Sequence, residues 1–113
     1  MIQQIRPAQL ADWLASEQVR GEPVVLDVRE PWELQTAAVR PEGFTLLAIP
    51  MGDVPARLAE LDADRPVACL CHHGGRSQRV AAFLVQNGFS RVANLAGGID
   101  AWSQERDPTV ARY

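Results

Sequence analysis

The sequence predicts an α/β domain with a largely parallel sheet. Short apolar runs typical of buried parallel strands alternate along the chain with segments of helical periodicity. The clearest strands are Val24–Val28 and Val67–Leu70, because both are almost continuously apolar. The length of 113 residues suits one domain, and we expect residues 1–113 to fold as a single unit with its own core.

In the amino-terminal half, Ile2–Ile5 is predicted as a short edge strand. A helix is predicted from Pro7 to Gln18, because proline suits the first turn of a helix and the apolar residues that follow fall on or near one face. The strand Val24–Val28 comes next. Residues 34–43 have poor patterning, so we expect a short helix and a loop there.

The carboxy-terminal half continues the alternation. Thr45–Ile49 predicts a strand, and Asp53 is placed to cap a helix that extends to Leu61. Another helix is predicted from Gln78 to Asn87, with Gly88 where a helix C-terminal glycine belongs. The remaining elements in this half are the strand Val92–Leu95 and a short helix carrying Ile99 and Trp102.

Composition excludes several classes of function. The net charge of −3 argues against a general nucleic-acid binder, and no apolar run approaches the roughly 20 residues of a membrane span. The first residues lack the apolar core of a signal peptide. The two cysteines, Cys69 and Cys71, are too close on extended backbone for an unstrained disulfide, so we expect reduced thiols and a cytoplasmic protein.

The most informative segment places a thiol at the end of a strand. Cys71 follows the apolar strand Val67–Leu70, and sites in parallel sheets lie at the carboxyl ends of strands. Gly74 and Gly75 permit a tight loop whose backbone N–H groups converge on the sulfur, and a helix begins near Ser77. A helix amino terminus and converging N–H groups favour a thiolate or a sulfur-borne anion.

The distribution of charge supports the same segment. Between Arg65 and Ile99 there are four arginines and no acidic residue, while the rest of the chain carries the other seven arginines and all fourteen acids. A locally positive field would stabilise a thiolate and attract small anions. The alternative is that folding scatters these arginines over unrelated faces.

Three motifs resemble the rhodanese-like sulfurtransferases. Residues 71–77, Cys-His-His-Gly-Gly-Arg-Ser, follow the Cys-x-x-Gly-x-Arg-Ser pattern of that family's active-site loop. Residues 26–33, LDVREPWE, are similar to its early strand-and-turn motif, and residues 95–102, LAGGIDAW, to its closing motif. The resemblance implies a small three-layer domain with about five parallel strands and helices on both faces.

The resemblance also implies a chemistry without a cofactor or metal. Cys71 would take a sulfane sulfur from a small anionic donor such as thiosulfate and pass it, as a persulfide, to cyanide or a thiol. The loop has six residues from Cys71 to Arg76. The related cell-cycle phosphatases and arsenate reductases carry a loop one residue longer, so phosphoryl or arsenate chemistry is the less favoured alternative. A non-enzymatic persulfide relay or interaction module with a protein donor or acceptor is the other alternative.

Roles for the other loop residues follow from that resemblance. Arg76 would orient the anionic donor, and Gly74 and Gly75 would place backbone N–H groups. Ser77 either donates a hydrogen bond towards the sulfur or caps the helix. His72 and His73 either line the pocket mouth and bias the choice of acceptor, or one of them acts as a general base. These histidines and the two cysteines are too close in sequence to surround one metal ion tetrahedrally.

Supporting residues complete the prediction. Asp27 and Arg29 are interpreted as a buried carboxylate and a salt-bridging arginine that organise the site from beneath. Cys69 is interpreted as a core residue, with a resolving thiol as the alternative. Residues 38–47 depart from the family's pattern, which puts the local surface and the identity of a partner in question. The modest surface and the resemblance suggest a monomer.

Overall fold

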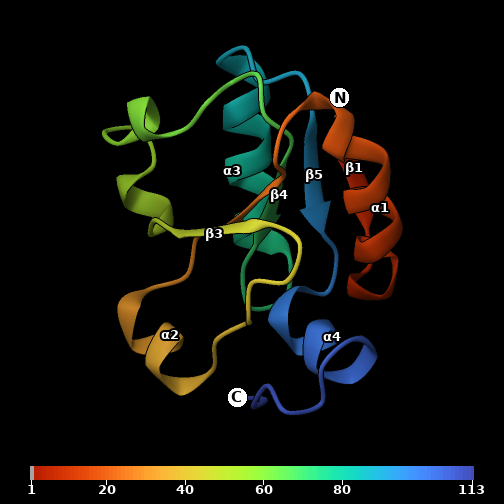
Figure 1. Ribbon diagram of the computed structural model, residues 1–113. Helices are drawn as coiled ribbons and strands as arrows, with labels where there is room; N and C mark the ends of the chain where they lie inside the picture. The colour runs from red at the N-terminus through yellow and green to blue at the C-terminus, as the bar shows by residue number, and fades with distance from the viewer. Residues whose placement is uncertain (1) are drawn as a thin grey trace.

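Five short strands form one parallel sheet in the computed structural model, which describes residues 2–113 (Figure 1). The strands are β1 (Ile2–Ile5), β2 (Val24–Asp27), β3 (Thr45–Ala48), β4 (Val67–Leu70) and β5 (Val92–Leu95). Their spatial order is β1-β5-β4-β2-β3, and every neighbouring pair is parallel. The predicted class is therefore confirmed, with β1 at one edge of the sheet.

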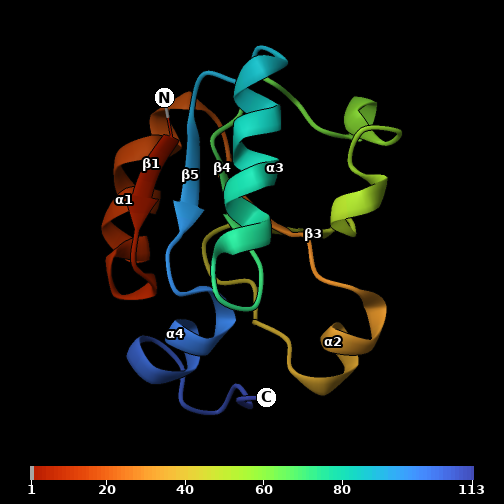
Figure 2. The same cartoon turned by 180° about the vertical axis from the view of Figure 1, so that it is seen from behind.

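Helices cover both faces of this sheet. They are α1 (Leu10–Glu17, preceded by the 3-10 turn Pro7–Gln9), α2 (Pro31–Thr36), α3 (Gly75–Gln86) and α4 (Gly98–Glu105). In the two opposite views, α3 lies on one face and α1 on the other, while α2 and α4 gather near the carboxyl ends of the strands (Figures 1 and 2). None of the helices within residues 2–113 is long and apolar enough to cross a bilayer.

Strand alternation divides the core into two layers. On one side of β4, Ala68 and Leu70 pack in a cluster with Leu10 of α1 and Trp102 of α4. On the other side, Val67, Cys69 and the following Cys71 pack in a cluster with Val80 and Leu84 of α3. Burying both faces explains why these strands lack the alternation of polar and apolar residues seen in half-exposed strands.

The structure corrects the prediction at the segment that follows β3. The helix expected from Asp53 to Leu61 is absent, and two 3-10 turns, η3 (Met51–Asp53) and η4 (Leu58–Glu60), stand in its place. One bond of the α-helical type forms, from the Arg57 N–H to the Asp53 carbonyl at 3.1 Å, but the later bonds, from Glu60 to Arg57 and from Leu61 to Leu58, span only three residues. The apolar residues of the segment still reach the core beside α3, because turns can deliver them there as a helix would.

The helix after Cys71 also begins earlier than predicted. It starts at Gly75 instead of Gln78, so Arg76 and Ser77 belong to its first turn. Its carboxyl end confirms the role expected for Gly88, which has a φ of 91°. There the Phe89 N–H donates to the Leu84 carbonyl at 3.1 Å, and the Gly88 N–H donates to the Val85 carbonyl at 3.2 Å, a Schellman motif.

Candidate active site

A tight loop between β4 and α3 holds the Cys71 thiol. Gly74, the last residue before α3, adopts a φ of 108°, which only glycine tolerates readily. Its N–H donates to the Cys71 Sγ at 3.1 Å, and the Ser77 Oγ lies 3.2 Å from the same sulfur. The Cys71 residue is 1% exposed. The sulfur thus lies at the amino end of a helix, with the Gly74 N–H directed at it and the Ser77 hydroxyl beside it, an arrangement that stabilises anionic sulfur.

The amino end of α4 fixes the loop from behind. The Ile99 N–H donates to the Cys71 carbonyl at 2.8 Å, and the Asp100 N–H donates to the His72 carbonyl at 3.2 Å. Gly98 has a φ of 59°, and a Cβ atom there would lie only 2.5 Å from the Cys71 carbonyl oxygen. Because the N–H groups of α4 donate to these two carbonyls on its own side, the loop can turn the Gly74 N–H towards the sulfur.

Ser77 belongs to a buried polar network on the α3 face of the sheet. Its Oγ is 2.5 Å from the Asn94 Oδ1 and 3.2 Å from the Gly74 carbonyl. The Asn94 amide in turn donates to the Gly74 carbonyl and to the Gln4 Oε1. Gly74 occupies the N-cap position, so the capping alternative for Ser77 is not seen. The network fixes the hydroxyl beside the sulfur.

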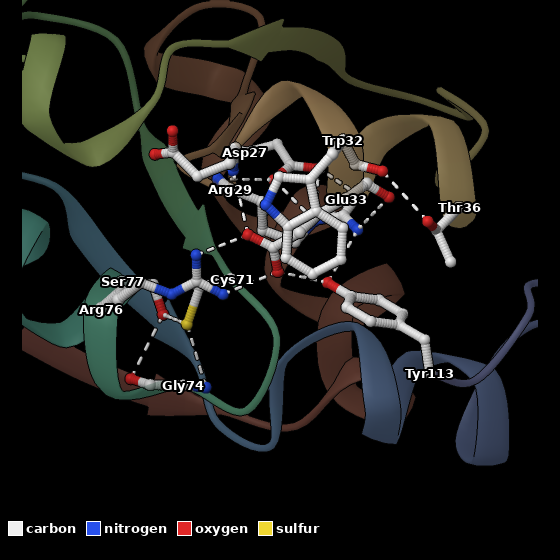
Figure 3. A network of polar contacts seen from close by, with 11 residues as sticks. Asp27, Arg29, Trp32, Glu33, Thr36, Cys71, Gly74, Arg76, Ser77 and Tyr113 are labelled. Atoms are coloured by element: carbon white, nitrogen blue, oxygen red, sulfur yellow. Dashed lines mark hydrogen bonds and ion pairs between the residues drawn. The ribbon is translucent and has the colours of Figure 1, made fainter.

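Arg76 forms a bidentate ion pair with Glu33 of α2 (Figure 3). Its two terminal nitrogens donate to the two Glu33 carboxylate oxygens at 2.6 and 2.8 Å. The hydrogen bonds from Arg76 lower the pKa of Glu33 to about 2 from its ordinary 4.5, against the opposing effect of burial. The same pairing raises the pKa of Arg76. The charge expected to orient a donor is therefore balanced by a carboxylate that remains ionised at neutral pH.

Beneath this pair lies a second buried ion pair. The Arg29 guanidinium, which is 0% exposed, donates to both Asp27 carboxylate oxygens, with the shortest contact at 2.8 Å. It also donates to the Glu33 carbonyl and to the Tyr113 hydroxyl. That hydroxyl donates onward to Glu33 at 2.6 Å. Two arginines, two carboxylates and one phenol thus satisfy one another at the carboxyl ends of the strands, as Figure 3 shows.

The two histidines lie at the rim of the loop and stack. The His72 and His73 ring centroids are 3.9 Å apart, and the Tyr113 ring lies 3.8 Å from the other side of His72. The His72 Nε2 also donates to the Tyr113 carbonyl at 2.7 Å. Trp32 meets the Tyr113 ring edge-on and is itself 62% exposed. These rings form a wall beside the loop.

Folding takes two of the four arginines in the acid-free segment away from the thiol. Arg65 and Arg91 precede β4 and β5, so they lie at the amino ends of the strands, opposite Cys71. Arg65 pairs with Glu22 at 3.7 Å, and Arg91 approaches Glu17 at 3.8 Å. The sequence pattern thus overstated the positive field at the thiol.

The second cysteine is a core residue in this structure. Cys69 is 0% exposed and packs in the same apolar layer as Val80 and Leu84. Burial, and to a smaller extent the neighbouring Cys71, raises the pKa of the Cys69 thiol. A thiol that stays protonated is a poor nucleophile, which agrees with the structural interpretation.

The structure brings together the predicted loop residues with Asp27 and Arg29, but it adds three that the sequence analysis missed. Asn94 carried a signal, since it is a polar residue in an apolar strand at a position that faces α3. The sequence also held a signal for Glu33. It is an acidic residue in the motif at residues 26–33, and an arginine in the Cys71 loop needs a counter-ion. No sequence signal indicated Tyr113, because it lies 80 residues from its partner Glu33.

Comparisons with known proteins agree with this geometry. Residues 8–105 match the rhodanese-like domain family. A sulfurtransferase of Allochromatium vinosum is 35% identical over 111 residues, which is 98% of this chain and 97% of that protein. The crystal structure of a rhodanese-related protein from Thermoplasma volcanium superposes with a TM-score of 0.77 at 30% identity, covering 98% of this chain and 99% of the other.

A third relative is named for its donor. The thiosulfate sulfurtransferase GlpE of Actinobacillus pleuropneumoniae is 41% identical over 56 residues, and this match spans 50% of the present chain and 52% of that protein. This chain has a parallel five-stranded sheet, and its Cys71 loop lies between β4 and α3. This chain belongs to the rhodanese-like domain family, and it is similar to sulfurtransferases over nearly its whole length.

The contact behind the loop predicts the effect of a single methyl group. Gly98→Ala places a Cβ against the Cys71 and His72 carbonyls at a φ that side chains rarely adopt. We expect the free energy of unfolding to fall by about 2 kcal/mol or more in denaturant titrations. Gly52→Ala is the matched control, because a Cβ there meets open space and should change stability by less than about 0.5 kcal/mol. Equal stability of the two variants would contradict the contact.

The Glu33 pair predicts a pH dependence of stability. A carboxyl whose pKa is lowered on folding contributes stability above its unfolded pKa, and this contribution is lost as the pH falls through the folded value. Glu33→Gln should therefore be less stable than the wild type at pH 7, by on the order of 1 to 3 kcal/mol. The difference should shrink between about pH 4.5 and pH 2.

Urea titrations at several pH values measure that difference. Glu60→Gln serves as the matched control, because Glu60 pairs with Arg57 on an exposed surface, where solvent and salt screen the pair, and its loss should change stability much less. A difference for Glu33→Gln that stays constant from pH 7 to pH 2 would contradict the assignment.

Proposed function

We propose that this chain is a sulfurtransferase that carries sulfane sulfur as a persulfide on Cys71, with thiosulfate as donor and cyanide or a thiol as acceptor. The observation that carries the proposal is the Cys71 Sγ in contact with the Gly74 N–H and the Ser77 Oγ at the amino end of α3. The similarity to a protein named thiosulfate sulfurtransferase supports the choice of donor.

The reaction has two displacement steps. In the first, the Cys71 thiolate attacks the outer sulfur of thiosulfate, the S–S bond of thiosulfate breaks, and sulfite leaves with the electron pair. In the second, the acceptor attacks the outer sulfur of the Cys71 persulfide, whose S–S bond breaks and returns the thiolate. With cyanide as acceptor the product is thiocyanate. Splitting the transfer through a covalent intermediate is the usual advantage of an enzyme nucleophile.

Each neighbouring group has a proposed part in these steps. The Gly74 N–H and the Ser77 hydroxyl stabilise negative charge on the Cys71 sulfur, both before attack on the donor and when the outer sulfur passes to the acceptor and the thiolate returns. Arg76 orients the anionic donor while Glu33 fixes the guanidinium in place. His72 and His73, with the exposed Gly75 at the start of α3, line the mouth beside the sulfur. Asp27 and Arg29 support the site from beneath and do not touch the sulfur.

The six-residue loop favours sulfur over phosphate. Cys71 is 1% exposed, and its sulfur is already in contact with the backbone of Gly74. A tetrahedral oxyanion needs room for its oxygens over the loop, whereas a persulfide adds a single atom. A persulfide relay that serves a dedicated protein partner remains the second candidate, and the exposed Trp32 beside the loop favours it.

Thiocyanate formation from thiosulfate and cyanide tests the proposal. Cys71→Ser should abolish turnover, because serine forms no persulfide, while Cys69→Ala should retain at least half of it, because that thiol is buried and protonated. Turnover that survives Cys71→Ser would contradict the proposal. Hydrolysis of p-nitrophenyl phosphate that depends on Cys71 would replace it with a phosphatase.

A further inference from the structure

A small apolar cavity lies between the segment that contains η3 and the second and third turns of α3. Its volume is about 150 Å³, and it is lined by Met51, Val54, Pro55, Arg79, Val80 and Phe83. Five of these residues are apolar and one is cationic. The segment that contains η3 passes alongside α3 in Figure 2. A cavity of this size admits a short aliphatic segment but not a folded partner.

The cavity belongs to the same end of the molecule as the thiol. The Met51 N–H donates to the Val28 carbonyl at 2.9 Å, and the Val28 N–H donates to the Leu70 carbonyl at 2.9 Å. This chain of bonds runs along the carboxyl ends of β3, β2 and β4, directly before Cys71. Val80, in the cavity wall, also packs in the same apolar cluster as Cys71.

The separation between the sulfur and the cavity follows from helix geometry. The Ser77 Oγ is 3.2 Å from the Cys71 Sγ. Val80 lies three residues beyond Ser77, and residues at that spacing are neighbours on a helix surface, about 5–6 Å apart at Cβ. The cavity wall at Val80 is therefore about one helical turn beyond the residue whose hydroxyl contacts the sulfur. Thiosulfate has no hydrocarbon with which to occupy this apolar wall.

Arg79 supplies a free charge at the cavity. It is exposed, and among residues 2–113 it has no carboxylate within 4.0 Å, unlike the other three arginines of the acid-free segment. Arg76, one turn before it, has its charge balanced by Glu33. An anionic group that approaches this side of α3 therefore meets the Arg79 guanidinium uncompensated.

We propose that this cavity and Arg79 form an acceptor subsite for an aliphatic thiol that carries an anionic group at its far end. The inference rests on the proposed function. The thiol end reaches the Cys71 persulfide, the hydrocarbon occupies the cavity, and the carboxylate pairs with Arg79. The thiol sulfur attacks the outer sulfur, a new S–S bond forms, and the Cys71 S–S bond breaks to give the thiolate. The acceptor leaves as its own persulfide with the proton of the original thiol.

Three thiols separate the contributions of chain and charge. Mercaptoacetate has the carboxylate without the chain, 6-mercaptohexanol has the chain without the carboxylate, and 6-mercaptohexanoate has both. The protein is loaded with sulfur from thiosulfate and freed of excess donor, and the persulfide product is trapped with a fluorescent alkylating agent. We expect the second-order rate constant for 6-mercaptohexanoate to exceed each of the others by about three- to five-fold.

Two arginine variants complete the test. Arg79→Gln should remove the advantage of 6-mercaptohexanoate over 6-mercaptohexanol. Arg20→Gln removes an equal charge from an exposed turn after α1 and should preserve it. Three results would overturn the subsite while leaving the proposed function intact. The three thiols could have equal rate constants, or the advantage of 6-mercaptohexanoate over 6-mercaptohexanol could survive Arg79→Gln. The same advantage could also be lost in both arginine variants. A wild-type chain that takes up no sulfur would contradict the proposed function and this inference with it.

Discussion

The tight turn between β4 and α3 is the constraint on which the rest of the site depends. The chain must leave a buried strand, place a thiol and begin a helix within four residues, Cys71 to Gly74. It does so because Gly74 adopts a left-handed conformation and N–H groups at the amino end of α4 donate to the Cys71 and His72 carbonyls. The sulfur then faces the Gly74 N–H and the start of α3. Without that turn, the sulfur would not lie beside the charged residues that surround the loop.

The buried charges serve the loop by cancelling one another. Arg29 and Arg76 are matched by Asp27 and Glu33, and the Tyr113 hydroxyl links the two pairs. Removing one member of such a set would leave a charge without a partner in a site of low exposure, which costs more than the pair contributes. The balance also limits the net positive charge at the thiol. The chemistry therefore relies on local hydrogen bonds and the helix amino terminus more than on a long-range field.

The sequence predicted what depends on local pattern. Nearly continuous apolar runs located β2 and β4, and Gly88 located the end of α3, because both signals lie within a few residues of the structure they specify. The position of Cys71 after β4 then placed the thiol at the correct edge of the sheet. Interactions between distant residues were not accessible: the Arg76–Glu33 pair joins residues 43 apart. Local pattern also failed at the segment after β3, where two 3-10 turns replace the expected helix from Asp53 to Leu61.

The most direct test of the account is the intact mass of the protein after incubation with thiosulfate and removal of the excess. The loop geometry predicts that the wild type gains about 32 Da, one sulfur atom, that the gain is reversed by cyanide, and that Cys71→Ser gains nothing. An unchanged wild-type mass, or the same gain in Cys71→Ser, would contradict the claim that the turn after β4 exists to hold sulfur on Cys71.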